Sequence, residues 1–306
     1  MAEARFEHHM SDEDALMWNI EKDPILRSTI LAVAEFDRPP DWAALRTRID
    51  RGTRVIPRLR QRVLSPPLRI GPPRWTVDPS FDLDFHLRRV RLPAPGTERV
   101  LLDVLQPIAS AAFDRARPLW EFTLLEGLVR EDGTEGAALA MKVHHSVTDG
   151  VGGMALLTEL VDFERFAPPP DDTNVPAAPA PEAFDSLALI RDSLGHTTRR
   201  FLGIARRVPA TVLTTTVVAV RHPAAAGVQL AQTARSVARI LAPATAPMSP
   251  VMRDRGMGRQ LAKFTISIDD VRRAGKSVDG SINDVFLAAV TGGLQRYHAH
   301  HGTAPP

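Results

Sequence analysis

Two strongly apolar segments separated by a short turn constrain the fold more than any other part of this 306-residue chain. Residues 120–128 and 137–143 consist mainly of residue types that favour buried strands. Between them lies Glu131-Asp132-Gly133, a sequence typical of a tight turn. We therefore expect two buried strands joined by this turn.

Strand and helix patterns alternate along the rest of the chain. We expect strands at residues 28–36, 75–77, 87–92 and 260–268, and helices at 41–54, 100–112, 153–166 and 282–300. A further helix should begin after Ser11, which is expected to cap it with Asp14 as its partner. Pro107 should kink the helix at 100–112 or mark a first turn. The alternation predicts an α/β or α+β fold, a two-layer sandwich.

Composition shifts divide the chain into three parts, at residues 1–167, 168–250 and 251–306. Proline, alanine and aspartate dominate residues 168–181, a composition that does not pack a core. Residues 186–241 follow with helical apolar stripes and eight arginines against one acid, Asp192. This segment is either an amphipathic helix that rests on anionic lipid or a packed connector between two lobes with a solvated basic face.

The composition excludes several classes of protein. Cysteine is absent, which rules out disulfides, thiolate metal sites and a cysteine nucleophile, and which fits a reducing compartment. The formal net charge of +2 argues against a dedicated nucleic-acid binder. Residues 1–10 lack the apolar core of a secretory signal, and no apolar run is long enough to span a membrane. We expect a cytoplasmic protein that is soluble or peripheral to a membrane.

Residues 144–150, His-His-Ser-Val-Thr-Asp-Gly, follow the second apolar strand and are the candidate reactive loop. Adjacent strand residues point to opposite faces, so only one of His144 and His145 can face a substrate in the same way. Asp149 and Gly150 suit a tight turn. A neutral histidine can accept a proton from a hydroxyl near pH 7 without a metal or a covalent intermediate.

Other interpretations of this loop stay open from the residues alone. A histidine pair can be purely structural. A metal site would need a third ligand, and none is evident near the pair. A catalytic triad built on Ser146 would need a nucleophile elbow, which the sequence does not resemble.

The pattern His-His-x-x-x-Asp-Gly resembles the signature of the chloramphenicol acetyltransferase and condensation-domain superfamily of CoA-dependent acyltransferases. The chain is most similar to one branch, the bacterial wax ester synthase/diacylglycerol acyltransferase family. The matching stretches occur in the family's order: Ser11 to Leu16, with Asp14 at a family aspartate; Arg74-Trp75 with Phe81-Asp82-Leu83 and His86; Arg115-Ala116-Arg117-Pro118-Leu119-Trp120-Glu121; and Asn283-Asp284-Val285.

The resemblance implies a two-lobed fold with a tunnel between the lobes, in which acyl-CoA enters from one face and a fatty alcohol or diacylglycerol from the other. His145 would deprotonate the acceptor hydroxyl, which attacks the thioester directly, and no cofactor is implied. Asp149 would hold the loop, and His144 would belong to the loop or the tunnel wall. Pro118, Leu119 and Trp120 would serve mainly in packing.

The end of the chain departs from this family. Asn283, next to Asp284, is expected either to orient substrate or an oxyanion, or to cap its helix. Family members continue through further strands, so we expect an incomplete second lobe here. Met248-Ser249-Pro250 also stands where the family often has asparagine. An apolar stripe on the last helix, including Phe286 and Leu294, would then need a second copy of the chain or a separate C-terminal partner chain to cover it.

Three functions are compatible with these residues. The first is transfer of a long acyl chain from acyl-CoA to a diacylglycerol or fatty alcohol. The second is a catalytically impaired remnant or fragment of such an enzyme that binds acyl chains or lipid. The third is a small-molecule acetyltransferase or peptide-condensing domain, which would share only the histidine loop.

Overall fold

The computed structural model describes residues 8–67, 70–148, 160, 175–182, 184–200, 202, 249, 251 and 256–304. Contacts divide the chain into two units, Met1–Phe201 with Arg259–Leu261, and Leu202–Gly258 with Ala262–Pro306. Asp149, Gly150 and most of the expected helix at 153–166 lie outside the described residues, although Leu160 is helical and buried.

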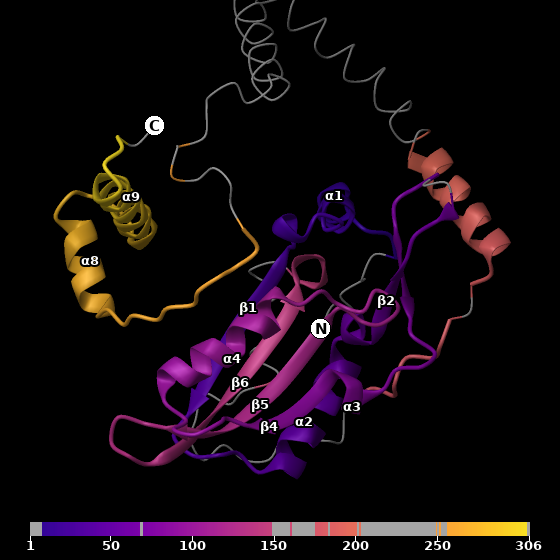
Figure 1. The fold of residues 1–306 in the computed structure, drawn as a ribbon. Helices are drawn as coiled ribbons and strands as arrows, with labels where there is room; N and C mark the ends of the chain where they lie inside the picture. Colours follow the sequence, from indigo (N-terminus) through magenta and orange to yellow (C-terminus); the bar gives the residue numbers. More distant parts are fainter. Residues whose placement is uncertain are drawn as a thin grey trace, which may run out of the picture. The chain divides into compact units, whose positions relative to one another are not determined.

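A four-stranded sheet in the order β1-β6-β5-β4 forms the centre of the first unit (Figure 1). Its strands are β1 (Thr29–Phe36), β4 (Leu87–Arg91), β5 (Trp120–Val129) and β6 (Glu135–His144). The predicted hairpin is confirmed as β5 and β6, the two central strands, which pair antiparallel in a register that sets Trp120 opposite Val143. β4 runs parallel to β5 at one edge, and β2 (Gln61–Leu64) pairs with β3 (Arg74–Val77) in a separate small sheet.

Helices cover both faces of the large sheet because β5 and β6 carry apolar side chains on both sides. α2 (Trp42–Val55) and the short α3 (Leu83–His86) pack on the face formed by Trp120, Phe122, Leu124, Leu139 and Met141. α4 (Glu98–Ser110) packs on the opposite face, formed by Leu125, Ala138 and Ala140. Pro107 lies inside α4 rather than at its start.

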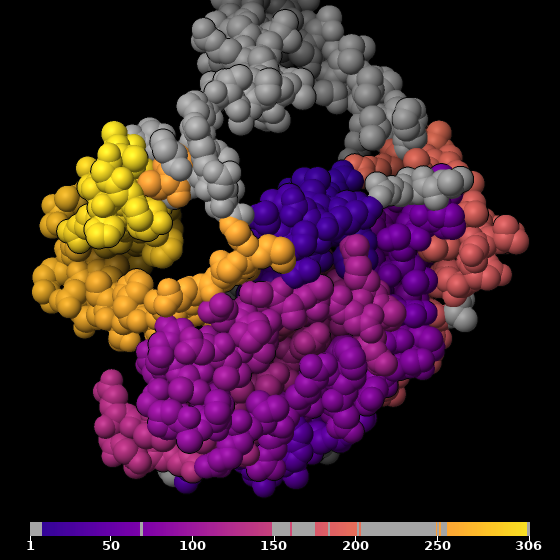
Figure 2. All heavy atoms as spheres, in the orientation of Figure 1, coloured from indigo at the N-terminus to yellow at the C-terminus, as the bar shows by residue number. Residues whose placement is uncertain are grey.

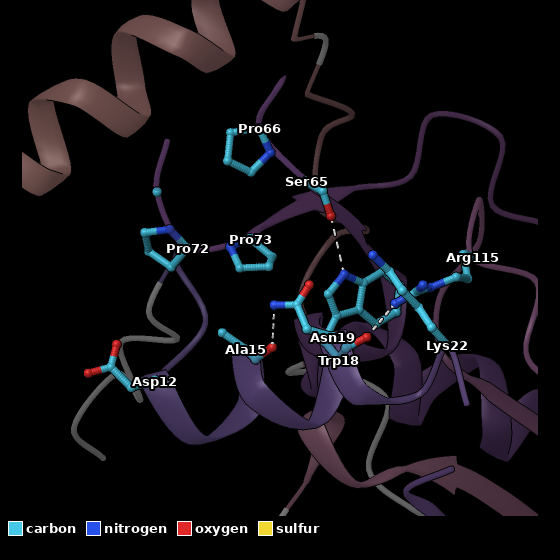
Figure 3. A pocket seen from close by; sticks show the side chains of 11 residues that line it. Asp12, Ala15, Trp18, Asn19, Lys22, Ser65, Pro66, Pro72, Pro73 and Arg115 are labelled. Atoms are coloured by element: carbon cyan, nitrogen blue, oxygen red, sulfur yellow. Dashed lines mark hydrogen bonds between the residues drawn. The ribbon is translucent and has the colours of Figure 1, made fainter. Parts of the chain in front are cut away.

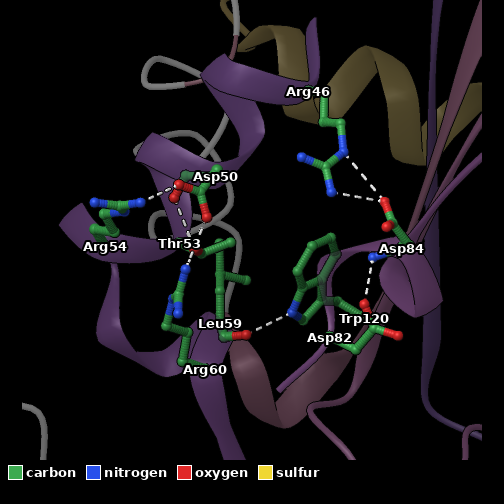
Figure 4. Close-up of polar contacts among 9 residues, drawn as sticks. All are labelled: Arg46, Asp50, Thr53, Arg54, Leu59, Arg60, Asp82, Asp84 and Trp120. Atoms are coloured by element: carbon green, nitrogen blue, oxygen red, sulfur yellow. Dashed lines mark hydrogen bonds and ion pairs between the residues drawn. The ribbon is translucent and has the colours of Figure 1, made fainter. Parts of the chain in front are cut away.

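Trp120 joins the sheet to the layer that contains α2. Its side chain is fully buried, and its indole N–H donates to the carbonyl of Leu59 at 2.7 Å (Figure 4). Leu59 belongs to the turn η2 (Pro57–Arg60) that follows α2. Arg60 ties this turn back to α2 through Asp50, at 2.8 Å. The turn η2 therefore connects Trp120, the first residue of β5, to α2.

The predicted start of the first helix is confirmed. α1 (Asp12–Ile20) begins after Ser11, whose Oγ accepts the backbone N–H of Asp14 at 3.1 Å and donates to the Asp14 carboxylate at 2.8 Å. Near the end of α1, Trp18 is buried and its indole N–H donates to Ser65 at 3.2 Å. These contacts dock α1 on the first unit, which Figure 2 shows as a closely packed body coloured indigo to pink.

Residues 186–200 form a helix that packs on the rest of the first unit through a half-buried charge cluster. Asp192 lies 2.9 Å from both His9 and Arg74, and the tilted rings of His9 and His196 have centres 4.0 Å apart. These contacts turn Asp192 inward. Leu187 and Leu194 of the expected apolar stripe consequently face solvent, with exposed fractions of 72% and 53%.

The second unit contains α8 (Ile268–Lys276) and α9 (Ile282–His300). The helix predicted at 282–300 is confirmed, whereas the strand predicted at 260–268 is wrong. Residues 260–267 have no strand partner, and α8 begins at Ile268. An alternating pattern specifies a strand only when a neighbouring strand accepts its backbone hydrogen bonds. Phe264, within this range, is 87% exposed.

The N-cap of α9 is Ser281, not Asn283 as one of the two interpretations proposed. Ser281 is the N-cap, and it forms a reciprocal capping box with Asp284, so Asn283 lies inside the first turn and is exposed. The interpretation of Asn283 as a cap is therefore wrong. Along the same helix, Phe286 and Leu294 of the expected stripe are exposed. His298 is buried, and its Nε2 contacts the hydroxyl of Ser249.

His86 combines complete burial with an incomplete set of hydrogen bonds. Its ring is stacked between Phe81 and Trp120, and its Nδ1–H donates to the Trp120 carbonyl at 2.7 Å. Its Nε2 is buried without a hydrogen-bond partner among the described residues. Burial lowers the pKa of His86 to about 4, although the hydrogen bond to Trp120 acts in the opposite direction. The folded chain therefore holds this imidazole neutral.

We predict that acid destabilises the first unit through His86. The folded pKa lies below the ordinary value of 6.5, so the unfolded state binds a proton first as pH falls. Stability is fully present above about pH 6.5 and is lost as pH falls towards about 4, by up to about 3 kcal/mol. Urea unfolding followed by tryptophan fluorescence measures this, because Trp18, Trp42, Trp75 and Trp120 all lie in the first unit.

The matched variant is His86→Asn, which keeps a donor for the Trp120 carbonyl but cannot titrate. It should be less stable at neutral pH and lose much less further stability between about pH 7 and about pH 4.5. An identical pH dependence in both proteins would show that His86 does not cause the loss.

Candidate active site

The two adjacent histidines are fixed at the end of the central strand by bonds to both neighbouring strands. The N–H of His144 donates to the carbonyl of Leu119 at 3.0 Å, on the side of β5. The N–H of His145 donates to the carbonyl of Ser28 at 2.8 Å, on the side of β1. β6 ends here, and the turn η4 (His145–Val147) begins. The backbone of the pair cannot shift without breaking the sheet ladder on one side or the other.

The imidazole of His144 is completely buried, and each of its nitrogens faces a polar group. Nδ1 accepts the backbone N–H of Ser146 at 3.0 Å and lies 2.7 Å from the Ser146 hydroxyl. Because Nδ1 is an acceptor, the proton of the neutral ring lies on Nε2. Nε2 is 3.2 Å from the Glu21 carboxylate, without the alignment of a hydrogen bond. Trp18 and Phe113 meet the ring edge-on, each at 6.1 Å.

His145 differs from its neighbour in every one of these respects. Its side chain is half-buried, and its imidazole makes no hydrogen bond or ion pair to the part of the chain that the structure describes. The alternation of β6 predicted that only one of the two rings could face a substrate. The geometry shows which ring is committed to internal contacts, and it is His144.

Two charged side chains near His144 were not singled out from the sequence. Burial raises the pKa of Glu21, but the contact with His144, the charge of Arg115 and the backbone of Ser28 outweigh it and hold that pKa below its ordinary value. Lys142, two residues before His144, is completely buried, and burial lowers its pKa. A lysine inside an apolar strand was a visible signal for the second of these residues. Glu21 follows a helix, where an acid is unremarkable in sequence.

Lys142 is held by one aromatic ring and one distant carboxylate. Its Nζ lies 4.3 Å from the centre of the Phe113 ring and 3.9 Å from Glu121, its partner across the β5–β6 pair. No hydrogen bond reaches Nζ from the described residues. Phe113 therefore contacts a cation on one side and the edge of His144 on the other.

A pocket of about 340 Å³ opens beside α1 (Figure 3). Trp18, Lys22 and Arg115 contribute to its lining, together with prolines of the loop at residues 66–73. Arg115 lies over the Trp18 ring at 3.5 Å and donates to the Trp18 carbonyl at 2.6 Å. His145 is not among the lining residues, so the pocket and the candidate base are separate features of the described structure.

The remaining candidate residues have different positions. Pro118, Leu119 and Trp120 are buried at the start of β5, where Leu119 supplies the carbonyl that binds the backbone of His144. Asn283 and Asp284 lie in the second unit, at the start of α9. Asp149 and Gly150 fall outside the described residues.

The described residues lack two kinds of feature. They contain no group of three or more histidine, aspartate or glutamate side chains placed to hold a metal ion. They also contain no helix that is both long and apolar enough to cross a membrane.

Comparison with known proteins identifies relatives of the chain. The family model of the wax ester synthase/diacylglycerol acyltransferase catalytic domain matches residues 10–286. A Mycobacterium tuberculosis protein provisionally named as a diacylglycerol O-acyltransferase is 39% identical over 302 residues, 97% of this chain and 60% of that protein. A second such protein from the same organism is 33% identical over 257 residues, 84% of this chain and 47% of that protein.

Among solved structures, the wax ester synthase/diacylglycerol acyltransferase from Marinobacter aquaeolei is 29% identical, with a TM-score of 0.42. That match covers 56% of this chain and 41% of the other. The chain spans about 60% of the length of the Mycobacterium tuberculosis relative that is 39% identical. The family match includes the sheet, the histidine loop and the first turn of α9. The chain belongs to the wax ester synthase/diacylglycerol acyltransferase family.

Proposed function

We propose that the chain carries the catalytic histidine of an acyl-CoA-dependent O-acyltransferase, which moves a long acyl chain to the hydroxyl of a diacylglycerol or a fatty alcohol. The observation that carries this proposal is the difference between the two histidines. His144 is buried with Nδ1 bonded to Ser146 and Nε2 beside Glu21, whereas His145 is half-buried and its imidazole makes no hydrogen bond to the described residues. The family match and the names of the relatives support the choice of substrates.

The proposed reaction needs one base and no covalent enzyme intermediate. His145 takes the proton of the acceptor hydroxyl while the oxygen attacks the thioester carbonyl. The carbon–sulfur bond then breaks, CoA leaves as the thiolate, and the imidazolium of His145 returns the proton to sulfur. The product is the ester together with free CoA thiol.

The other residues of the loop have supporting roles in this proposal. From the residue types alone, Asp149 and Gly150 are proposed to hold the loop that carries His145. The family resemblance alone supports the proposal that Asn283 orients substrate or an oxyanion.

We predict that His145→Ala reduces acyl transfer by about 10²–10⁴-fold, the typical contribution of a general base. The assay is release of free thiol from palmitoyl-CoA with hexadecanol or dioleoylglycerol as acceptor, using the full 306-residue chain. Tryptophan fluorescence during urea unfolding checks that the first unit stays folded. His8→Ala is the matched control, because His8 is exposed and only its backbone takes part in the fold.

Near-normal turnover by folded His145→Ala would contradict the assignment of the base. If the unaltered chain binds palmitoyl-CoA but releases no thiol with either acceptor, the proposed transferase function of this chain fails. That result would instead support the second candidate, a lipid-binding remnant of such an enzyme.

We further propose that the helix at residues 186–200 rests on an anionic lipid surface. Leu187 and Leu194 are separated by seven residues, so they lie on the same side of this helix, and both are exposed. Arg191 is exposed on that same side. Exposed leucines interspersed with arginine fit insertion into the boundary of a negatively charged lipid layer, where both of the proposed substrates and the ester product gather.

We predict that the chain sediments with phosphatidylglycerol vesicles and much less with phosphatidylcholine vesicles. Replacing Leu187 and Leu194 by serine should reduce vesicle binding by about tenfold or more, because two buried leucines account for about 3 kcal/mol of transfer free energy. The control replaces the exposed Leu16 and Val90 by serine. Equal losses in both double variants would show that the helix is not the lipid-binding surface.

A further inference from the structure

We infer that Glu21 is a positioning residue for the acyl transfer proposed above: its carboxylate holds the ring of His144 and, through it, the turn that presents His145. The inference rests on that proposed function. Nothing in the sequence pattern of the loop points to Glu21, because it lies more than 120 residues earlier in the chain. The fold brings the two together by docking the end of α1 against η4.

Glu21 and His144 are in direct contact. Oε1 of Glu21 lies 3.2 Å from Nε2 of His144, and the exposed fractions of the two side chains are only 10% and 0%. Glu21 is the residue that ends α1, and its own N–H donates to the carbonyl of Met17 at 3.3 Å. The carboxylate is therefore placed by a helix that Trp18 anchors on the first unit.

The opposite nitrogen of the same ring, Nδ1, is bonded to Ser146. The backbone N–H of Ser146 donates to Nδ1 of His144 at 3.0 Å, which requires the proton to lie on Nε2. A carboxylate beside Nε2 favours that tautomer, because it attracts the proton on the nitrogen that faces it. Ser146 is the residue directly after His145. Glu21 thus acts on the position of His145 through the tautomer of His144 and the peptide of Ser146.

Ser28 is a neighbour that Glu21 and His145 share. Its carbonyl accepts the N–H of His145 at 2.8 Å, and its backbone contributes to the lowered pKa of Glu21. The remaining contacts of the His144 ring are aromatic edges, from Trp18 and Phe113, which confine the ring but do not select a tautomer.

The kinetic experiment compares Glu21→Ala and Glu21→Gln with the unaltered chain in the thiol-release assay. Glu21→Ala should lower kcat by roughly 10- to 100-fold, the scale for losing an outer partner that orients an imidazole, with KM for palmitoyl-CoA little changed. Glu21→Gln keeps an acceptor oxygen for Nε2–H and should recover most of kcat. Glu13→Ala is the control, because Glu13 is an exposed acid on the same helix.

A full kcat in folded Glu21→Ala would overturn the inference. So would equal losses of kcat in the alanine and glutamine variants that follow their losses of stability in urea, because that pattern describes a purely structural residue.

A second measurement does not depend on turnover. Nitrogen-15 NMR of the imidazoles, assigned with His144→Gln, should show His144 as the Nε2–H tautomer in the unaltered chain and in Glu21→Gln. Glu21→Ala should show a mixture of tautomers. An unchanged His144 signal in Glu21→Ala would contradict the inference even in a chain without acyl-transfer activity. Absence of thiol release from the unaltered chain, with the expected NMR change, would instead count against the proposed function alone.

Discussion

The backbone pairing of β5 with β6 determines the positions of the core and of the candidate site in the first unit. Trp120 faces Val143 across this pair, and one further bond, from His144 to Leu119, extends the ladder beyond the strand. A shift of the register by one residue would exchange the two faces of β6. His144 would then leave the Glu21 side of the sheet, and the apolar residues beneath α2 and α4 would exchange layers. The core and the candidate site therefore depend on the same set of hydrogen bonds.

Parts of this arrangement could be predicted from sequence because they depend on local chemistry. The central hairpin follows from two apolar segments and a turn, and α1 follows from a serine cap with an acid three residues later. The helix at Ile282–His300 also follows from its own periodicity. At Phe264 and Ile266 the same kind of argument failed, because a strand needs a partner and a pattern within one segment cannot supply it.

The candidate site shows a similar division. Alternation along β6 predicts that His144 and His145 differ, but the choice between them depends on what α1 and Phe113 place against each ring. Glu21 and His144 are distant in sequence, so no motif spacing connects them. Asn283 was open to two interpretations because asparagine is a common cap. The neighbouring Ser281 and Asp284 occupy that role together, and local propensity alone could not rank the three residues.

The edge strand β4 has a consequence for how the molecule behaves in a concentrated solution. Three of its five residues are arginines, and two of them, Arg89 and Arg91, form paired contacts with Glu126 and Glu135. A free strand edge is a template on which another molecule can add a strand, and long charged side chains along the edge oppose that addition. The ion pairs hold these side chains along the sheet, which protects an otherwise open row of backbone groups from aggregation.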